Sequence, residues 1–278
     1  MSERFTFGIP LVARAVAGDW ALVDRLLGLT LRSVLAQTDG DFRVLLAAHD
    51  EPASWGRVAR DPRFELLRAD WTPEPPNAAN DDGGAKKWLI KRRVRELGGG
   101  LLMFLDADDW VARDLVATAR GAMNPGHVGG IVAHGVALDF ATMGAAPFPV
   151  PGAGDFPFHG LCGSSTIGRV VPGSADPFEA DPHLALGSHH EWEERAREAG
   201  RSLARLNTWG AYVVGTTQNH SETNGPFAGW RREVTEAVRR HGAPLDARMA
   251  RSFGQELADL RAAPARDQHL GSSQPRAI

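Results

Sequence analysis

The fold is decided by the stretch Leu101-Leu102-Met103-Phe104-Leu105-Asp106-Ala107-Asp108-Asp109-Trp110. Its first five residues are all apolar, which predicts a strand that is covered on both faces of a sheet. Three carboxylates follow at the carboxyl end of that strand, where open α/β sheets bind their ligands. In extended backbone, residues two apart face the same side, so the side chains of Asp106 and Asp108 are expected to converge on one point.

Strands and helices alternate ahead of this stretch. The sequence predicts strands at residues 5–9, 42–48 and 64–67, and helices at 19–37 and 86–97. Asp19 is placed to cap the first helix, and Gly98-Gly99-Gly100 ends the second. This alternation predicts an α/β fold with a mostly parallel, Rossmann-like central sheet and helices on both faces.

The rest of the chain is less regular. Gly, Pro and Phe are frequent at residues 139–158, which predicts a long surface loop. The further elements expected are a helix at 188–199, a strand at 209–214, C-terminal helices at 230–240 and 245–262, and a disordered tail at 263–278. No repeat and no clear linker divides the chain, so a single domain is expected over residues 1–262.

Composition excludes several classes of protein. The chain has 278 residues, with 31 basic and 34 acidic side chains and a net charge of −3, so it lacks the basic excess of a nucleic-acid binder. A single cysteine excludes an internal disulfide and a cysteine-rich zinc module. No run approaches the roughly 18 apolar residues of a membrane span, and the N-terminus lacks the apolar run of a secretion signal. We therefore expect a cytoplasmic protein, for which peripheral association with a membrane stays open.

The acidic cluster after the apolar strand predicts a metal site. Two carboxylates as close as those of Asp106 and Asp108 repel each other, and a divalent cation removes that repulsion. Hard oxygen ligands suit Mg²⁺ or Mn²⁺, which keep water and substrate phosphate groups as further ligands. Aspartates also cap helices, and the alternative is a helix that begins near Trp110. Three acids directly after five apolar residues favour the metal and diphosphate site.

Four segments of the chain resemble the family 2 glycosyltransferases, which have the GT-A fold and use nucleotide sugars. In chain order they are similar to the family's "SLLxQTxxxFEV" stretch at 30–44, its DxD region at 106–108, its "GxSS" segment at 160–165 and its "LxxRxxxxG" helix at 188–200. Arg195 and Gly200 are in register with that last motif. The resemblance covers roughly residues 5 to 225, and the opening stretch is similar to a bacterial rhamnosyltransferase-like branch.

The resemblance implies a role for each of these segments. Residues 1–125 would form the nucleotide-binding half, 126–225 the sugar and acceptor half, and 226–262 C-terminal helices. Asp106 and Asp108 would hold Mn²⁺ or Mg²⁺, and a C-terminal histidine, His220, would be a further metal ligand. The substrate contacts that it implies are Asp50 with the nucleobase, Asp106 with the nucleotide diphosphate, and Gly163, Ser164 and Ser165 with the sugar and acceptor. Apart from the resemblance, Lys87 lies on a basic helix face ahead of the acidic cluster, where it is expected to neutralise the diphosphate.

The general base falls where the chain departs from the family. In the family it is a carboxylate just ahead of the "LxxRxxxxG" helix, and the register set by Arg195 puts Ser188-His189 at the acidic pair. His189, His190 and Glu191 are therefore the candidates. An imidazole titrates near neutrality and is able to serve as a base. We choose Glu191, because it is the first carboxylate of the predicted helix.

These residues together predict a metal-dependent glycosyltransferase. It would move a sugar from a nucleotide-diphosphate donor to a hydroxyl of a saccharide, a lipid-linked or a small-molecule acceptor. A single base implies inversion at the anomeric carbon. Three alternatives stay open: a phosphohydrolase of the DxD type, a nucleotidyltransferase, and a nucleotide-sugar-binding module without catalysis.

Overall fold

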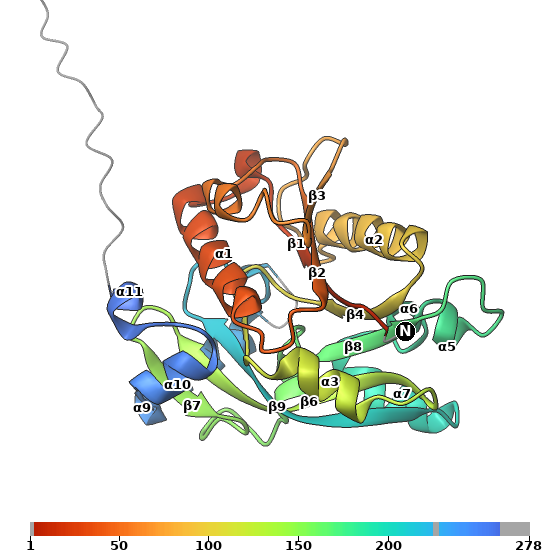
Figure 1. Ribbon diagram of the computed structural model, residues 1–278. Coiled ribbons are helices and arrows are strands. Elements are labelled where there is room, and N and C mark those ends of the chain that lie inside the picture. The colour runs from red at the N-terminus through yellow and green to blue at the C-terminus, as the bar shows by residue number, and fades with distance from the viewer. Residues whose placement is uncertain (1–2, 225–227, 262–278) are drawn as a thin grey trace, which may run out of the picture.

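A single curled sheet organises the computed structural model of the protein, which describes residues 3–224 and 228–261 (Figure 1). The strands are β1 (Phe5–Pro10), β2 (Phe42–Ala48), β3 (Phe64–Arg68), β4 (Gly100–Phe104), β5 (Trp110–Val111), β6 (His127–Asp139), β7 (Gly144–Pro147), β8 (Thr166–Val170), β9 (Ser202–Val214) and β10 (Ala243–Pro244). Their order is β10-β7-β6-β8-β4-β1-β2-β3, and β9 pairs with β5 and β6. The predicted α/β fold with a Rossmann-like, mostly parallel central sheet is confirmed.

Parallel pairing in the first half of the chain brings the carboxyl ends of β1, β2, β3 and β4 to one edge of the sheet. β1 pairs in parallel with β2 and with β4, and β2 pairs in parallel with β3. The carboxyl ends of these strands therefore meet at the same edge of the sheet. β8 continues the sheet from β4 in the antiparallel direction, and β6 runs antiparallel to β8 and parallel to β9. The segments that follow β1, β2 and β4 thus come together, although they are far apart in the sequence.

Helices cover both faces of this sheet. They are α1 (Trp20–Leu35), α2 (Asp81–Glu96), α3 (Leu115–Ala122), α4 (Phe158–Leu161), α5 (Pro177–Ala180), α6 (Pro182–Ala185), α7 (Trp192–Glu198), α8 (His220–Thr223), α9 (Ala228–His241), α10 (Ala247–Ser252) and α11 (Leu257–Arg261), with short 3₁₀ turns at Arg14–Val16, Ala53–Arg57 and His189–Glu191. α1 packs Val23, Leu27 and Leu31 on one face of β1 and β2, whereas α2 packs Ile90 and Val94 on the other. Figure 1 shows these strands between the two helices. Within the described residues, no helix is both long and apolar enough to cross a membrane.

The predicted N-terminal cap of α1 is confirmed, whereas the predicted first residue of α2 is wrong. Asp19 caps α1 as predicted, because its carboxylate accepts a hydrogen bond from Leu22 N–H at 3.0 Å. α2 begins at Asp81 and not at residue 86. Acidic residues in a first turn interact favourably with the helix dipole, so Asp81 and its neighbour Asp82 favour this earlier start. The two glycines that follow them do not prevent it.

The second half of the chain contains more strand than the sequence predicted. β6 runs to Asp139 and β7 forms within residues 139–158, so the long surface loop expected there is wrong in part. The predicted helix at 245–262 is divided into α10 and α11, because Gly254 between them adopts a φ of +69°. The predicted tail at 263–278 lies outside the described residues.

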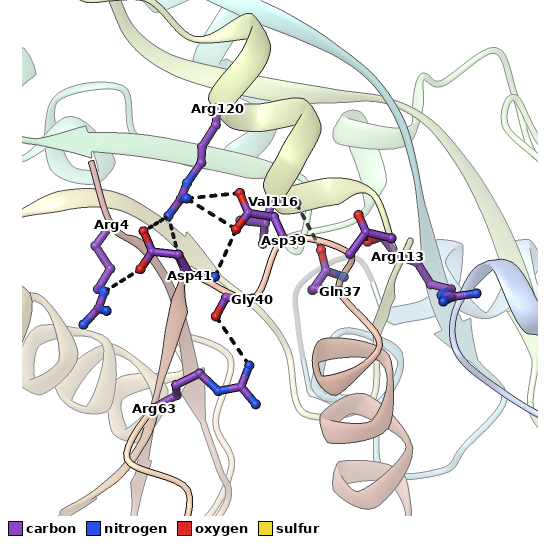
Figure 2. A network of polar contacts seen from close by, with 10 residues as sticks. Arg4, Gln37, Asp39, Gly40, Asp41, Arg63, Arg113, Val116 and Arg120 are labelled. Atoms are coloured by element: carbon purple, nitrogen blue, oxygen red, sulfur yellow. Dashed lines mark hydrogen bonds and ion pairs between the residues drawn. The ribbon is translucent and has the colours of Figure 1, made fainter. Parts of the chain in front are cut away.

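A polar network fixes the loop between α1 and β2 to α3 (Figure 2). Gln37 accepts a hydrogen bond from Val116 N–H at 3.0 Å. Arg120 of α3 pairs with Asp39 at 3.0 Å and with Asp41 at 2.9 Å. The network lies ahead of the first residue of β2, at the amino end of that strand. The segment that carries Gln37 therefore has a structural role.

Candidate functional site

A cleft of about 310 Å³ opens beyond the carboxyl ends of β1 and β4. Its wall includes Asp106, Asp108, His189, His220 and Lys87. These side chains come from the turn after β4, the 3₁₀ turn at His189–Glu191, the start of α8 and the middle of α2. The fold thus brings together five of the residues that the sequence singled out.

Asp106 and Asp108 both line this cleft at the carboxyl end of β4, but they lie in a turn and not in the extended backbone that the sequence analysis assumed. The Asp106 N–H donates a hydrogen bond to Ser164 Oγ at 2.9 Å, which fixes the turn after β4. Burial, and then the carboxylates of Asp109 and Asp106, raise the pKa of Asp108 well above its usual range. A divalent cation between these groups would remove the repulsion.

Asp109 has a different role from its two acidic neighbours. It is only 1% exposed, and its carboxylate accepts hydrogen bonds from Val213 N–H at 2.9 Å and from the Cys162 thiol at 3.3 Å. Burial and the nearby charge of Asp106 raise the pKa of Asp109 to about 7. The alternative of a helix capped by these acids near Trp110 is wrong, since Trp110 begins strand β5. Asp109 instead joins the turn after β4 to β9 and to the segment after α4.

His220 and Lys87 lie on the cleft wall near these acids. Burial lowers the pKa of His220, and the negative charge of Asp106 opposes that shift, so the imidazole lies within electrostatic reach of the carboxylate. Within the described ranges, no three His, Cys, Asp or Glu side chains form a ready-made metal site. Mg²⁺ and Mn²⁺ usually bind one or two carboxylates and complete their shell with water and substrate phosphate. The pair of Asp106 and Asp108 fits a site of that kind.

His189 is the candidate base that lies on the cleft wall. Its Nδ1–H donates a hydrogen bond to the His159 carbonyl at 2.5 Å, which leaves Nε2 as the acceptor nitrogen. Burial lowers the pKa of His189 to about 4, so the ring is neutral near pH 7. His190 is exposed, and its ring centroid lies 5.4 Å from that of His189.

Glu191 lies outside the cleft lining, and both of its carboxylate oxygens have partners. One oxygen accepts a hydrogen bond from Ser188 N–H at 2.7 Å, and the other accepts one from Arg195 Nη2 at 2.6 Å. These two contacts lower the pKa of Glu191. Together with Ser188 it forms a capping box at the start of this helical segment.

The small residues after α4 divide between the cleft and the interior. Gly163 lines the cleft, and a Cβ at this position would lie 3.2 Å from Asp106 Oδ2. Ser164 is 2% exposed and accepts the Asp106 N–H, while Ser165 is fully buried and donates to the Cys162 carbonyl at 2.6 Å. The two serines thus support the loop, and the glycine leaves space beside the carboxylate of Asp106.

Asp50 follows β2 but is not among the residues that line the cleft. Its carboxylate accepts a hydrogen bond from Arg14 N–H at 2.7 Å. The charge of Asp50 also favours the protonated form of Lys86, although burial is the larger effect and lowers the pKa of that lysine. Lys86 also lines the cleft, but it is 1% exposed and its charge is paired with Asp82.

Two residues of the cleft wall, Arg231 and Tyr212, were not predicted from the sequence. Arg231 lies near the start of α9 and donates a hydrogen bond to the Leu161 carbonyl. The Tyr212 hydroxyl lies 2.9 Å from Ser221 Oγ, and burial raises the pKa of this tyrosine. Nothing in the local sequence separates Arg231 from the other basic residues of its helix, so only its position in the fold identifies it.

Comparison with known proteins gives distant similarities only. No protein-family profile and no curated protein sequence matches the chain. A Desulfovibrio desulfuricans G20 structure assigned as a nucleotide-diphospho-sugar transferase is similar over 87% of this chain and 99% of its own, at 13% identity and a TM-score of 0.38. The structure of CMP:2-keto-3-deoxy-manno-octonic acid synthetase with CTP is similar over 86% and 100%, at 11% identity and a TM-score of 0.36. Similarities this low do not establish a shared function.

Proposed function

We propose that the protein is a metal-dependent glycosyltransferase with the GT-A fold, which transfers a sugar from a nucleotide-diphosphate donor to an acceptor hydroxyl. The observation that carries this proposal is the meeting of Asp106, Asp108, His189, His220 and Lys87 in one cleft at the carboxyl edge of the sheet. Such a transfer needs carboxylates that hold a cation, a lysine that binds phosphate, and a neutral imidazole that accepts a proton. The acceptor would be a saccharide, a lipid-linked molecule or a small molecule.

Asp106 and Asp108 are the residues that would hold Mn²⁺ or Mg²⁺, with His220 as a further ligand. The cation would neutralise the negative charge that develops on the leaving nucleotide diphosphate. Lys87 adds a positive charge on the α2 wall, and Gly163 leaves room beside Asp106 for the donor. Asp50 stays the proposed contact for the nucleobase, because it follows the strand next to β1.

His189 is the better choice of base once the contacts of the three candidates are compared. It faces the cleft with Nε2 unprotonated, whereas Glu191 is engaged by Ser188 and Arg195. The negative charge of a bound diphosphate would raise the pKa of His189 from about 4, which strengthens it as a base in the loaded site. A single base of this kind supports an inverting transfer.

Binding of nucleotides tests the class of function. We would measure thermal shifts with UDP, GDP, dTDP and CDP, each with and without Mn²⁺. The proposal expects one nucleotide to stabilise the protein, and to do so more strongly with the metal. No shift with any nucleotide in either condition would contradict it.

Turnover of the donor identified in that panel tests the base. His189→Gln should bind the donor normally and lose about 100-fold or more in turnover, which is the scale of general-base loss. Glu191→Gln is the matched control and should keep most of the activity. A large loss in the Glu191 variant alone would return the role to Glu191, and product with retained anomeric configuration would contradict the inverting mechanism.

A further inference from the structure

Two cations line the cleft without a carboxylate partner among the described residues: Lys87 of α2 and Arg231 of α9. The Lys87 ammonium lies 5.5 Å from the centroid of the Phe104 ring. Arg231 donates to the Leu161 carbonyl, and its guanidinium carbon lies 5.3 Å from the centroid of the Trp230 ring. A ring face and a carbonyl orient a cation but do not neutralise it.

Other basic residues of α2 contrast with Lys87. Lys86 pairs with Asp82, and Lys91 pairs with Asp181 at 2.9 Å. These lysines therefore have their counter-charge within the protein. Lys87 keeps an available positive charge in the cleft, which is the property expected of a residue that binds an anion.

The two cations come from different elements of the cleft wall, Lys87 from α2 and Arg231 from α9. Burial is the main cause of the low pKa of both His189 and His220, but Arg231 adds to the shift at His189 and Lys87 adds to the shift at His220. The charge of Asp106 opposes both shifts. Both cations and the carboxylate of Asp106 thus act on the histidines of the same cleft.

We propose that Lys87 and Arg231 form a two-sided clamp for the diphosphate of the nucleotide, acting alongside a divalent cation. This inference rests on the proposed function of the cleft and adds a residue, Arg231, from a helix that the sequence did not connect with the donor. Lysine binds phosphate as a point charge, and arginine offers several N–H donors. A diphosphate between α2 and α9 would join the two walls of the cleft.

Inorganic pyrophosphate in the presence of EDTA is the probe that tests the clamp, because it carries no nucleobase and needs no metal. The full-length protein should bind it in a calorimetric titration. Lys87→Met and Arg231→Met should each weaken binding about tenfold, the scale of a lost charge-assisted hydrogen bond, and the double variant more than either. Each variant should remain folded at the temperature of the titration, and Arg231→Lys should bind more tightly than Arg231→Met.

Two matched controls carry the same change of charge outside the cleft. Lys91→Met lies on α2 but removes a lysine paired with Asp181, and Arg240→Met lies on the exposed end of α9. Both should leave the affinity for pyrophosphate unchanged. An equal loss of affinity in a control and in its cleft counterpart would show that the loss comes from the net charge of the protein and not from the cleft. That result would overturn the clamp.

The outcomes separate this inference from the proposed function. Binding of pyrophosphate only with Mn²⁺, with equal affinity in parent and cleft variants, would overturn the clamp and leave the glycosyltransferase proposal standing. Weakening in the Lys87 variant alone would also overturn the two-sided clamp. Absence of binding by any nucleotide or by pyrophosphate, with or without Mn²⁺, would remove the proposed function itself.

Discussion

Phe158 packs between two glycines of neighbouring strands, and this contact supports the wall of the cleft. A Cβ at Gly135 of β6 or at Gly210 of β9 would lie within 3.0 Å of atoms of the Phe158 ring. The ring has little room to move, because it is 1% exposed and packs edge-on against Phe148 at a centroid distance of 5.4 Å. Phe158 is also the first residue of α4, whose next residue, His159, accepts the hydrogen bond from His189.

Gly135→Ala is therefore expected to destabilise the protein strongly. Overpacking a buried site typically costs about 1–3 kcal/mol, and optimal carbon contacts lie near 3.5–4.0 Å. The new methyl group would start well inside that separation, so we expect a loss near the upper end, about 3 kcal/mol of unfolding free energy. For a chain of this size that corresponds to a fall in melting temperature of roughly 6–12 °C.

Urea denaturation followed by circular dichroism measures this loss. Gly121→Ala on α3 is the control, since nothing lies within 4 Å of the new Cβ, and it should be neutral or slightly stabilising. In a Phe158→Leu background the ring is gone, so Gly135→Ala should cost about 1 kcal/mol or less. An unchanged stability of Gly135→Ala, or the same cost in both backgrounds, would refute the packing argument.

Three further changes test the site and the interior. Asp108→Asn should fold normally and lose most of the Mn²⁺-dependent part of nucleotide binding in calorimetry, since one of the two proposed carboxylate ligands is gone; unchanged affinity would remove Asp108 from the proposed metal site. His220→Ala should raise the Mn²⁺ concentration needed for half-maximal activity, and an unaltered metal dependence would make His220 structural. Burial lowers the pKa of His183 from 6.5 to about 4. Between these two pH values the unfolded chain binds more protons at this residue than the folded protein does, so the free energy of unfolding falls as the pH falls through that window. His183→Gln should remove roughly 3 kcal/mol of that pH dependence, seen by urea denaturation between about pH 4 and 7; equal slopes would contradict the assignment.

The first half of the fold is readable from the sequence because its signals are local. Continuous apolar runs give β2 and β4, and a capped, periodic helix gives α1. β6 was not predicted, because the segment His127–Asp139 contains three glycines, which weaken any strand signal. Its pairing with β8 and β9 comes from later parts of the chain. Contacts over such distances leave no periodic pattern to recognise.

The proposed base, His189, is the residue of the candidate site that the sequence indicates least. Glu191 was chosen because it is the first carboxylate of its segment, yet the spacing Ser188-x-x-Glu191 is itself the sequence signature of a capping box. That signature was available and would have favoured a structural role. What the sequence does not contain is the direction of His189, because the backbone carbonyl that orients the imidazole belongs to His159, on another element.

The three acids after β4 show why position along a strand indicates a site but does not assign each role. Asp106 and Asp108 both line the cleft, while the next residue, Asp109, is turned into the protein. Its N–H bonds to the Asp106 carbonyl at 3.2 Å, so the chain has left extended geometry at this point and alternation no longer applies. Asp109 then accepts the Val213 N–H, which ties this turn to the strand that ends before His220. The acid that does not line the cleft is therefore the one that holds the two proposed metal-binding segments together.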